Sequence, residues 1–431
     1  MRVSSGMIFD AGVAGMNRQT ATLLHLQQQI SSGRRILTPS DDPVAAARAL
    51  EVQQNIDALT QFKRNQDAAT SALALEEAQL LGVGDLLAKA RELAVQAGST
   101  SLSASQRANI AMELRARFDQ LVGIANAADG LGQSMFSGYM GGVTPFGGSV
   151  DNLIAGGEIA YAGDDGQRTL QIAPGHEVAI SDSGNDGIKN IRSGNGYFDT
   201  AYNGANTGGG IIDSGSVTNP AAWNAAATKN VQIRFTITPG VTTYDLVDTV
   251  SGNSLLTGGA APAPLANQRV YQSGQPIVLR SQGAEPAFDL GATLTISGAP
   301  ASGDGFSVSP SSAQSVFVTL AKLIGALEAP VAGPGVDAKY MSEIKSAITN
   351  LDQASDNVLR ARAAVGARMN EIAATASMSA DMSLQYQQDL SVLQDIDYAK
   401  TYSDLIRKQT DLQAAQQSFL KIAQLSLFNY L

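Results

Sequence analysis

The sequence of 431 residues contains no cysteine, two histidines and one tryptophan. Without cysteine the chain has no disulfide, no thiolate metal site and no cysteine nucleophile. His25 and His176 are far apart in the sequence, and neither an HExxH, a GxSxG nor a GxxxxGK[ST] motif occurs. The sequence therefore predicts no catalytic residue, no metal site and no cofactor, and we expect the protein not to be an enzyme.

Charged residues are also sparse, at 16%, and the formal net charge is −10. This charge argues against nucleic acid as a partner, because binding it requires clustered Lys and Arg. It equally argues against binding to an anionic membrane. The most apolar stretch, 315–327, is too short to span a bilayer and contains Lys322. The opening MRVSSGMIFDAGVAGM lacks the apolar core of a signal peptide, so we expect a soluble chain that needs no cleaved signal if it is exported.

Proline and glycine are concentrated in the middle of the sequence. Twelve of the 14 prolines lie between Pro145 and Pro334, and 31 of the 43 glycines lie between Gly141 and Gly335. The flanks are rich in good helix formers. The predicted fold class is α+β, with a long antiparallel helical bundle or coiled coil formed by both chain ends and a central mainly-β domain inserted. The expected segments are a terminal helix at 1–42, a bundle half at 43–140, a β domain at 141–336, a second bundle half at 337–390 and a terminal helix at 391–431.

Apolar residues at heptad spacing run through both flanks. A C-terminal seam consists of Ile344, Ile348, Leu351, Val358, Val365, Met369 and Ile372, and an N-terminal seam consists of Leu73, Leu80, Leu87 and Ala94. We interpret both as the core of an intramolecular bundle. Ser103 and Gln106 predict a capping box for a further helix that ends near Asp129 and Gly130.

Two further apolar stripes lie at the chain ends. The first consists of Phe9, Met16, Leu23, Leu26 and Ile30, and the second of Leu405, Leu412, Ala415, Phe419 and Ile422. Either the two stripes pack on each other, or they form interfaces that are completed only between subunits. Isolated amphipathic helices are marginally stable in water, and the position of the stripes beyond the bundle favours assembly.

The middle of the chain has the alternation typical of β-strands. Segments 169–173, 177–180, 231–237, 243–247 and 293–296 are predicted strands, and Pro174-Gly175 predicts a turn. The segment 204–210 is interpreted as a loop too polar and glycine-rich to pack. Asp164-Asp165-Gly166 is interpreted as a turn rather than a calcium or acid–base site, and His25 as a residue on a helix surface.

The segment 31–43 reads SSGRRILTPSDDP and predicts a helix end followed by a helix start. Gly33 suits the positive φ of a helix end. Asp42 is a predicted N-cap and Pro43 suits the first helical turn. We interpret Ser40, Asp41 and Asp42 as capping residues rather than a cation site.

This segment and VLRARAAVGARMNEI at 358–372 together resemble the signatures of the bacterial flagellin superfamily. The resemblance implies that Gly33, Pro39, Asp41, Asp42 and Pro43 form a family turn and cap. It also implies helix-packing roles for Arg362, Gly366, Arg368 and Asn370, with Gly366 at a close approach of helices. MRVSS at 1–5, the Phe136-Ser-Gly exit within 128–139 and the end at 425–431 are similar to the hook-associated junction branch of this superfamily rather than to filament flagellin.

Membership of the junction branch implies a structural subunit that joins hook to filament and is needed for filament assembly and motility. Such a subunit is secreted by type III export to the extracellular flagellum. The implied partners are further copies in a homo-oligomeric ring, a neighbouring hook-associated protein on the hook side, flagellin on the filament side and an export chaperone at the C-terminal helix. Two alternatives stay open: a filament flagellin, and a secreted adhesin or enzyme carried in the central β domain.

Overall fold

A computed structural model describes residues 5–99, 101–331 and 333–424. The chain forms two compact units. Unit 1 comprises Met1–Asp67, Gln171–His176 and Ala373–Leu431, and unit 2 comprises Ala68–Leu170 and Glu177–Ile372. Two long helices, α2 (Pro43–Ala97) and α7 (Pro334–Gln394), contribute to both units. The predicted α+β class, with helical flanks around an inserted β domain, is confirmed.

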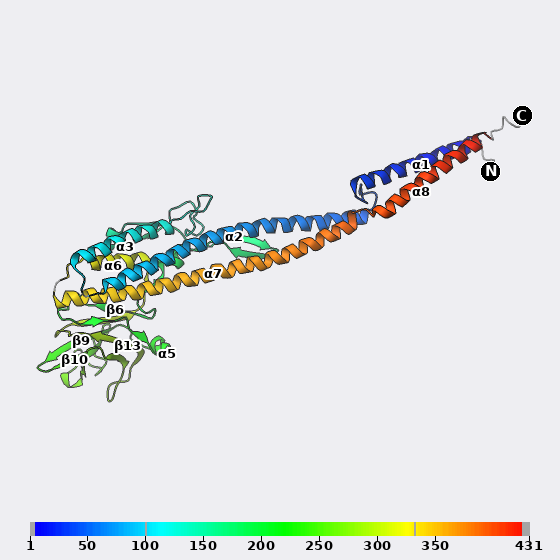
Figure 1. Ribbon diagram of the computed structural model, residues 1–431. Coiled ribbons are helices and arrows are strands. Elements are labelled where there is room, and N and C mark those ends of the chain that lie inside the picture. Colours follow the sequence, from blue (N-terminus) through cyan, green and yellow to red (C-terminus); the bar gives the residue numbers. More distant parts are fainter. Residues whose placement is uncertain (1–4, 100, 332, 425–431) are drawn as a thin grey trace. The chain divides into compact units, whose positions relative to one another are not determined.

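Unit 1 is built mainly from helices at the two ends of the chain. Helix α1 (Ser5–Ser32) packs alongside α8 (Tyr398–Gln424), drawn blue and red in Figure 1. The first part of α2 and the last part of α7 belong to the same unit, together with the tip of a hairpin formed by β3 (Thr169–Ala173) and β4 (His176–Ala179). The side-chain amides of Asn65 and Gln66 donate to the carbonyls of Gln171 and Ile172, at 2.7 and 2.8 Å, and so fix the hairpin tip to α2.

The helical part of unit 2 consists of the second part of α2, α3 (Ala104–Ala125), α6 (Val316–Glu328) and the first part of α7. Both predicted seams form its core. The buried members are Leu73, Leu80, Leu87, Ala94, Ile344, Leu351, Val358, Val365 and Ile372, each at most 2% exposed, whereas Ile348 and Met369 are half-buried. The capping box of Ser103 and Gln106 is confirmed. Helix α3 ends at Ala125, earlier than the predicted end at Asp129 and Gly130.

Helix α6 lies inside the range that the sequence assigned to the β domain. It begins at the N-cap Ser315, whose side chain accepts from the amide of Val318. Nearly every side chain of α6 is buried, and Phe317 packs edge-on against Phe118 of α3 at 5.6 Å between ring centroids. Only Lys322 and Glu328 of this helix are exposed. Its sequence is therefore a short, almost continuous apolar run, which cannot be assigned to helix or strand by periodicity alone. The insertion thus contains α6 and the short helices α4 (Val150–Ile154) and α5 (Pro220–Ala225) besides its strands, and it is mainly but not wholly β.

The β domain contains two antiparallel sheets. The first has the order β11-β10-β9-β14-β6, and the second has the order β12-β13-β7 with β8 also paired to β13. The strands are β6 (Phe198–Tyr202), β7 (Ile211–Ile212), β8 (Ser216–Val217), β9 (Val231–Thr238), β10 (Val241–Asp248), β11 (Arg269–Val270), β12 (Pro276–Arg280), β13 (Asp289–Ser297) and β14 (Gly305–Pro310). The shorter elements are β1 (Phe146–Gly147), β2 (Ala160–Tyr161), η1 (Asn185–Lys189), β5 (Ile191–Arg192), α5 (Pro220–Ala225), η2 (Leu265–Asn267) and β15 (Ala313–Gln314).

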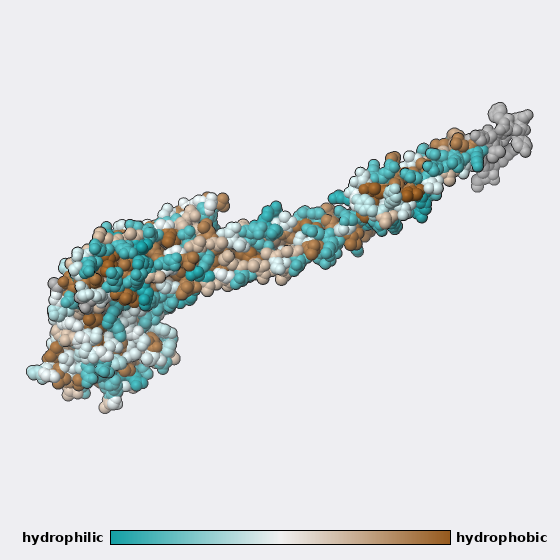
Figure 2. Space-filling model, viewed as in Figure 1, coloured by the Kyte–Doolittle hydropathy of each residue, from teal (hydrophilic) through white to brown (hydrophobic). Residues whose placement is uncertain are grey.

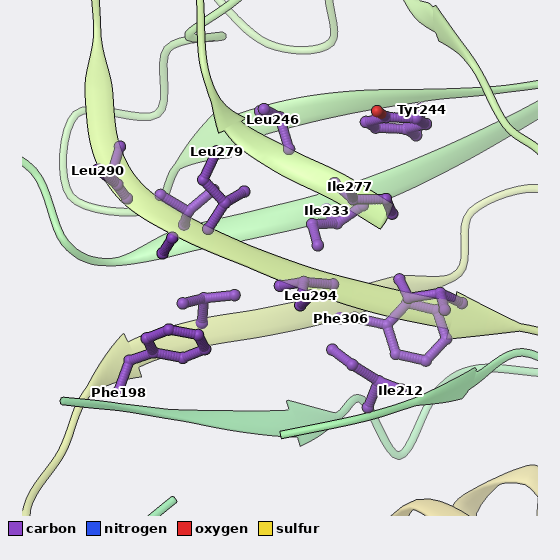
Figure 3. Packing of buried hydrophobic residues seen from close by; sticks show 14 of the residues in the cluster. Phe198, Ile212, Ile233, Tyr244, Leu246, Ile277, Leu279, Leu290, Leu294 and Phe306 are labelled. Atoms are coloured by element: carbon purple, nitrogen blue, oxygen red, sulfur yellow. The ribbon is translucent and has the colours of Figure 1, made fainter. Parts of the chain in front are cut away.

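Side chains from both sheets meet in one hydrophobic core (Figure 3). Strand β9 alternates buried and half-buried residues, as its sequence predicts, and pairs along its full length with β10. Phe235 and Phe306 meet edge-on at 5.8 Å, and Leu279 and Leu294 enter the core from the second sheet. The β domain thus closes an apolar core of its own.

The segment 204–210 is a loop as predicted, but the expectation that it would not pack is wrong. Asn206 and Gly208 are buried. The buried carboxylate of Asp304 accepts from the amides of Thr207 and Gly208 at 2.9 and 3.1 Å, so the polar backbone of the loop is satisfied inside the protein. A Cβ on Gly208 would lie 2.1 Å from the backbone nitrogen of Ala301. The glycine is thus what allows the loop to approach so closely.

Candidate functional site

The pair of helices α1 and α8 carries the two terminal stripes identified in the sequence. The rings of Phe9 and Phe419 contact each other at a tilt of 51°, with their centroids 5.0 Å apart. The Phe419 ring lies over Gly12, where an added Cβ would be only 2.8 Å from its nearest ring carbon. Leu23 is buried at 8% exposure. The stripes therefore face each other within one chain, which is the first of the two alternatives left open by the sequence.

This pairing covers the stripes only in part. Phe9 remains 52% exposed. The half-buried members are Met16, Leu26, Ile30, Leu405, Leu412, Ala415 and Phe419. Ile422 lies in α8, but its side chain is outside the described part of the structure. Apolar side chains thus interrupt the polar surface of this helix pair, as Figure 2 shows.

Further exposed apolar residues on the same helices were missed by the heptad pattern. They are Met7, Leu24, Tyr398, Tyr402, Ile406 and Leu420, each between 48% and 64% exposed. Tyr398, Tyr402 and Ile406 follow one another at intervals of four residues, which places them on one face of α8. A search of α8 for apolar residues four positions apart would have identified these three residues from the sequence.

The family turn at 33–43 has the predicted geometry. Helix α1 ends at Ser32, and Gly33 has φ +70°. Helix α2 begins at Pro43, and the Asp42 carboxylate accepts from the amide of Ala45 at 3.0 Å. That amide lowers the pKa of Asp42, with Arg35 adding to the effect. Asp42 is therefore the N-cap of α2.

Asp41 organises the turn itself. Its Oδ2 accepts from the amides of Leu37 and Thr38, each at 2.9 Å. These bonds, with the Thr38 amide first, lower the pKa of Asp41. His25 lies on the surface of α1 as predicted, with a side chain 39% exposed, and its Nε2 is 3.2 Å from the other carboxylate oxygen of Asp41. Pro39 lies exposed in the turn.

The same turn is joined to the connection between α7 and α8. The amide of Arg35 donates to the carbonyl of Gln394 at 2.7 Å, and the amide of Ile396 donates to the carbonyl of Gly33 at 3.1 Å. The Arg35 guanidinium bridges the Leu393 carbonyl and the Asp42 carboxylate. These bonds connect segments at opposite ends of the sequence, which spacing alone did not predict.

The family positions on α7 have different surroundings. Arg362 forms an ion pair with Glu77 of α2 at 2.7 Å, and Arg368 forms one with Asp182. Asn370 is exposed. At Gly366 a Cβ would meet no heavy atom of the described chain within 4 Å. The expected close approach of helices at Gly366 is therefore not found within this chain, because the glycine lies beside Val365 on a less buried part of the helix surface.

The segment 164–166 is a turn, as predicted. Asp164 Oδ1 accepts from the amides of Tyr139 and Gly166, both at 2.9 Å. Among the described residues no group of three or more acidic or histidine side chains is arranged to hold a metal ion. No helix among the residues that the structure describes is both long and apolar enough to cross a membrane.

Comparisons with known proteins agree with the arrangement of helices and β domain. Residues 3–140 match the family model of the bacterial flagellin N-terminal helical region. Flagellar hook-associated protein 3 of Salmonella typhimurium is 25% identical over 429 residues, which covers 99% of each chain. The crystal structure of flagellar hook-associated protein 3 from Legionella pneumophila is 30% identical, with a TM-score of 0.70, and the match covers 79% of this chain and 98% of that one. The chain belongs to the flagellar hook-associated protein 3 family.

Flagellins are similar over a much smaller part of the chain. Flagellin of Escherichia coli is 31% identical over 123 residues, which is 28% of this chain and 24% of the flagellin. The hook-associated protein 3 family, in contrast, accounts for the central domain as well as the helical ends. Its characterised members are structural proteins of the flagellum.

Proposed function

We propose that this chain is a structural subunit of the bacterial flagellum that forms the junction between hook and filament and is required for motility. The observation that carries the proposal is its similarity, over nearly its whole length, to hook-associated protein 3. A solved relative from Legionella pneumophila, 30% identical to this chain, is described as the flagellar junction protein. The proposal makes the protein an extracellular component without enzymatic activity.

We infer that the α1–α8 pair is the surface by which subunits assemble into a ring. Phe9, Leu24 and Leu420 are all more than half exposed there. Burying a large apolar side chain contributes about 1.5–3 kcal/mol, so neighbouring copies would stabilise a pair that is only partly covered alone. The proposed neighbours are a hook-side hook-associated protein and flagellin. The proposed partner before export is a chaperone at α8.

Removal of α8 tests this function. A chain lacking residues 401–431 should retain the folded β domain and bundle, because no residue of that segment that the structure describes belongs to their cores. Cells carrying it as their only copy should be non-motile and should release flagellin into the medium. Circular dichroism and urea unfolding of the purified chain check folding, and swarming checks function. Normal swarming by these cells would refute the proposal.

The alternatives predict different observations. A filament flagellin would be the dominant protein of sheared flagella, whereas a junction protein would be a trace component. A carried adhesin or enzyme would require saturable ligand binding or turnover in the segment 141–336, which hydrolase and carbohydrate-binding assays would detect.

A further inference from the structure

A largely buried cluster in unit 2 contains one guanidinium and two carboxyl groups, of which only Glu76 is fully buried, while Asp182 and Arg368 are half-buried. Glu76 lies on α2 and is 1% exposed. Arg368 lies on α7, and Asp182 lies in the segment between β4 and η1. The three residues come from three separate parts of the chain. The charges of the cluster therefore affect how that segment is held on the helices.

The hydrogen bonds of Arg368 are directed away from Glu76. Its Nη2 donates to Asp182 Oδ2, its Nη1 donates to the Ala179 carbonyl at 3.2 Å, and its Nε donates to the Ala364 carbonyl at 3.3 Å. Gln167 donates to the other oxygen of Asp182 at 2.8 Å. The half-buried Asp182 thus has a charged partner and a hydrogen bond on each carboxylate oxygen.

The carboxyl group of Glu76 accepts fewer hydrogen bonds than that of Asp182. Its Oε1 accepts from the amide of Asp182 at 3.0 Å, and its Oε2 is buried with no hydrogen-bond partner among the described residues. Desolvation and then the Asp182 charge raise the pKa of Glu76 to about 8, although Arg368 acts in the opposite direction. The cavity beside it, of about 430 Å³, is also lined by Asp186 and Arg360. The Arg360 guanidinium donates to the side chain of Asn357.

We propose that Glu76, Asp182 and Arg368 form a proton-dependent latch that holds the segment 177–187 against helices α2 and α7. When Glu76 carries a proton, the cluster has one negative and one positive charge, and the Asp182 amide is bound. When the proton is lost, two carboxylates compete for one guanidinium, and Oε2 of Glu76 has no hydrogen-bond donor among the described residues. The latch weakens as a result.

The sign of the pH dependence follows from proton linkage. In the closed latch Glu76 holds its proton up to about pH 8, whereas in an opened, hydrated segment it ionises at its ordinary pKa of about 4.3. The population of the open form therefore increases relative to that of the closed form as the pH rises between these two values. Above the higher value both forms are ionised and the effect ends.

Amide hydrogen exchange of the full-length protein tests the latch. Protection factors of peptides within 177–187, measured from about pH 5.5 to about pH 9, should fall by up to about tenfold per pH unit and then level off near pH 8. Glu76→Gln, which is neutral and of the same shape, should remove this fall. Glu77→Gln is the matched control, because Glu77 pairs with the half-exposed Arg362 instead, and it should keep the slope of the parent protein.

Protection in 177–187 that does not change with pH in the parent protein would overturn the proposal, as would an equal slope in Glu76→Gln. If Glu76→Gln does not fold, Asp182→Asn decides the question. Removing that negative charge lowers the pKa of Glu76, so the fall should level off at a lower pH. An unchanged curve for Asp182→Asn would also overturn the latch.

Discussion

The contact between Gly12 and Phe419 provides a direct test of how the terminal helices pack. An added Cβ at Gly12 would lie 2.8 Å from the Phe419 ring, whereas at Gly15, one turn later on α1, it would meet nothing within 4 Å. Replacing a helical glycine by alanine should by itself stabilise α1 by about 1 kcal/mol. Overpacking at a contact costs about 1–3 kcal/mol. Gly15→Ala should therefore stabilise the pair, and Gly12→Ala should be neutral or destabilising.

Hydrogen exchange of the full-length chain measures this difference. Peptides from α1 and α8 should be more protected in Gly15→Ala than in the parent protein, and less protected in Gly12→Ala than in Gly15→Ala. A difference of about 1.4 kcal/mol corresponds to a tenfold change in protection. Equal protection in the two variants would show that Phe419 does not pack on Gly12, and the proposed α1–α8 geometry would be refuted.

Three further predictions concern the cap, the bundle core and the assembly surface. Asp42→Ala should lower the free energy of unfolding of the first turns of α2 by about 1 kcal/mol, measured by hydrogen exchange, while Asp42→Asn should retain most of the cap. Leu80→Ala should lower the free energy of unfolding in urea by about 2–5 kcal/mol because Leu80 is 2% exposed, and Leu81→Ala is its control because Leu81 is 45% exposed. Phe419→Asp should reduce motility while the β domain unfolds at an unchanged urea concentration, because a charge in an apolar contact is costly; normal motility would contradict the assembly role of α8.

The helical frame could be predicted because its physical causes are local in the sequence. Heptad spacing places Leu80 and Leu351 on buried faces. The positive-φ Gly33 and the capping residue Asp42 mark the end of α1 and the start of α2. Helix α6 was not predicted, because its sequence is apolar almost throughout, and a short apolar run cannot be assigned to helix or strand by periodicity alone. The packed loop at 204–210 was missed for a related reason: the partner that satisfies it, Asp304, is distant in sequence.

The sequence predicted some residues of the α1–α8 surface but not all of them. The sequence identified Phe9 and Phe419, which do meet, yet it omitted Tyr402 and Ile406 because they lie outside the heptad positions. The bonds of Arg35 to the α7–α8 connection were also missed. Long-range pairing of this kind depends on how the two chain ends fold together. It therefore cannot be predicted from the spacing of residues within one segment.

The core of the β domain and the apolar stripes of α1 and α8 differ in how completely they are buried within one chain. In the β domain the core residues, such as Phe198 and Leu246, are 0% exposed, so the domain gains nothing further by binding a neighbour through its core. Among the described stripe residues of α1 and α8 only Leu23 is buried. Burial of each remaining large side chain would contribute up to about 1.5–3 kcal/mol, and several of them together approach the total stability of a small domain, about 5–15 kcal/mol. On the proposed assembly surface the free energy available for association therefore comes from these partly covered side chains of α1 and α8, whereas the β-domain core is already complete within one chain.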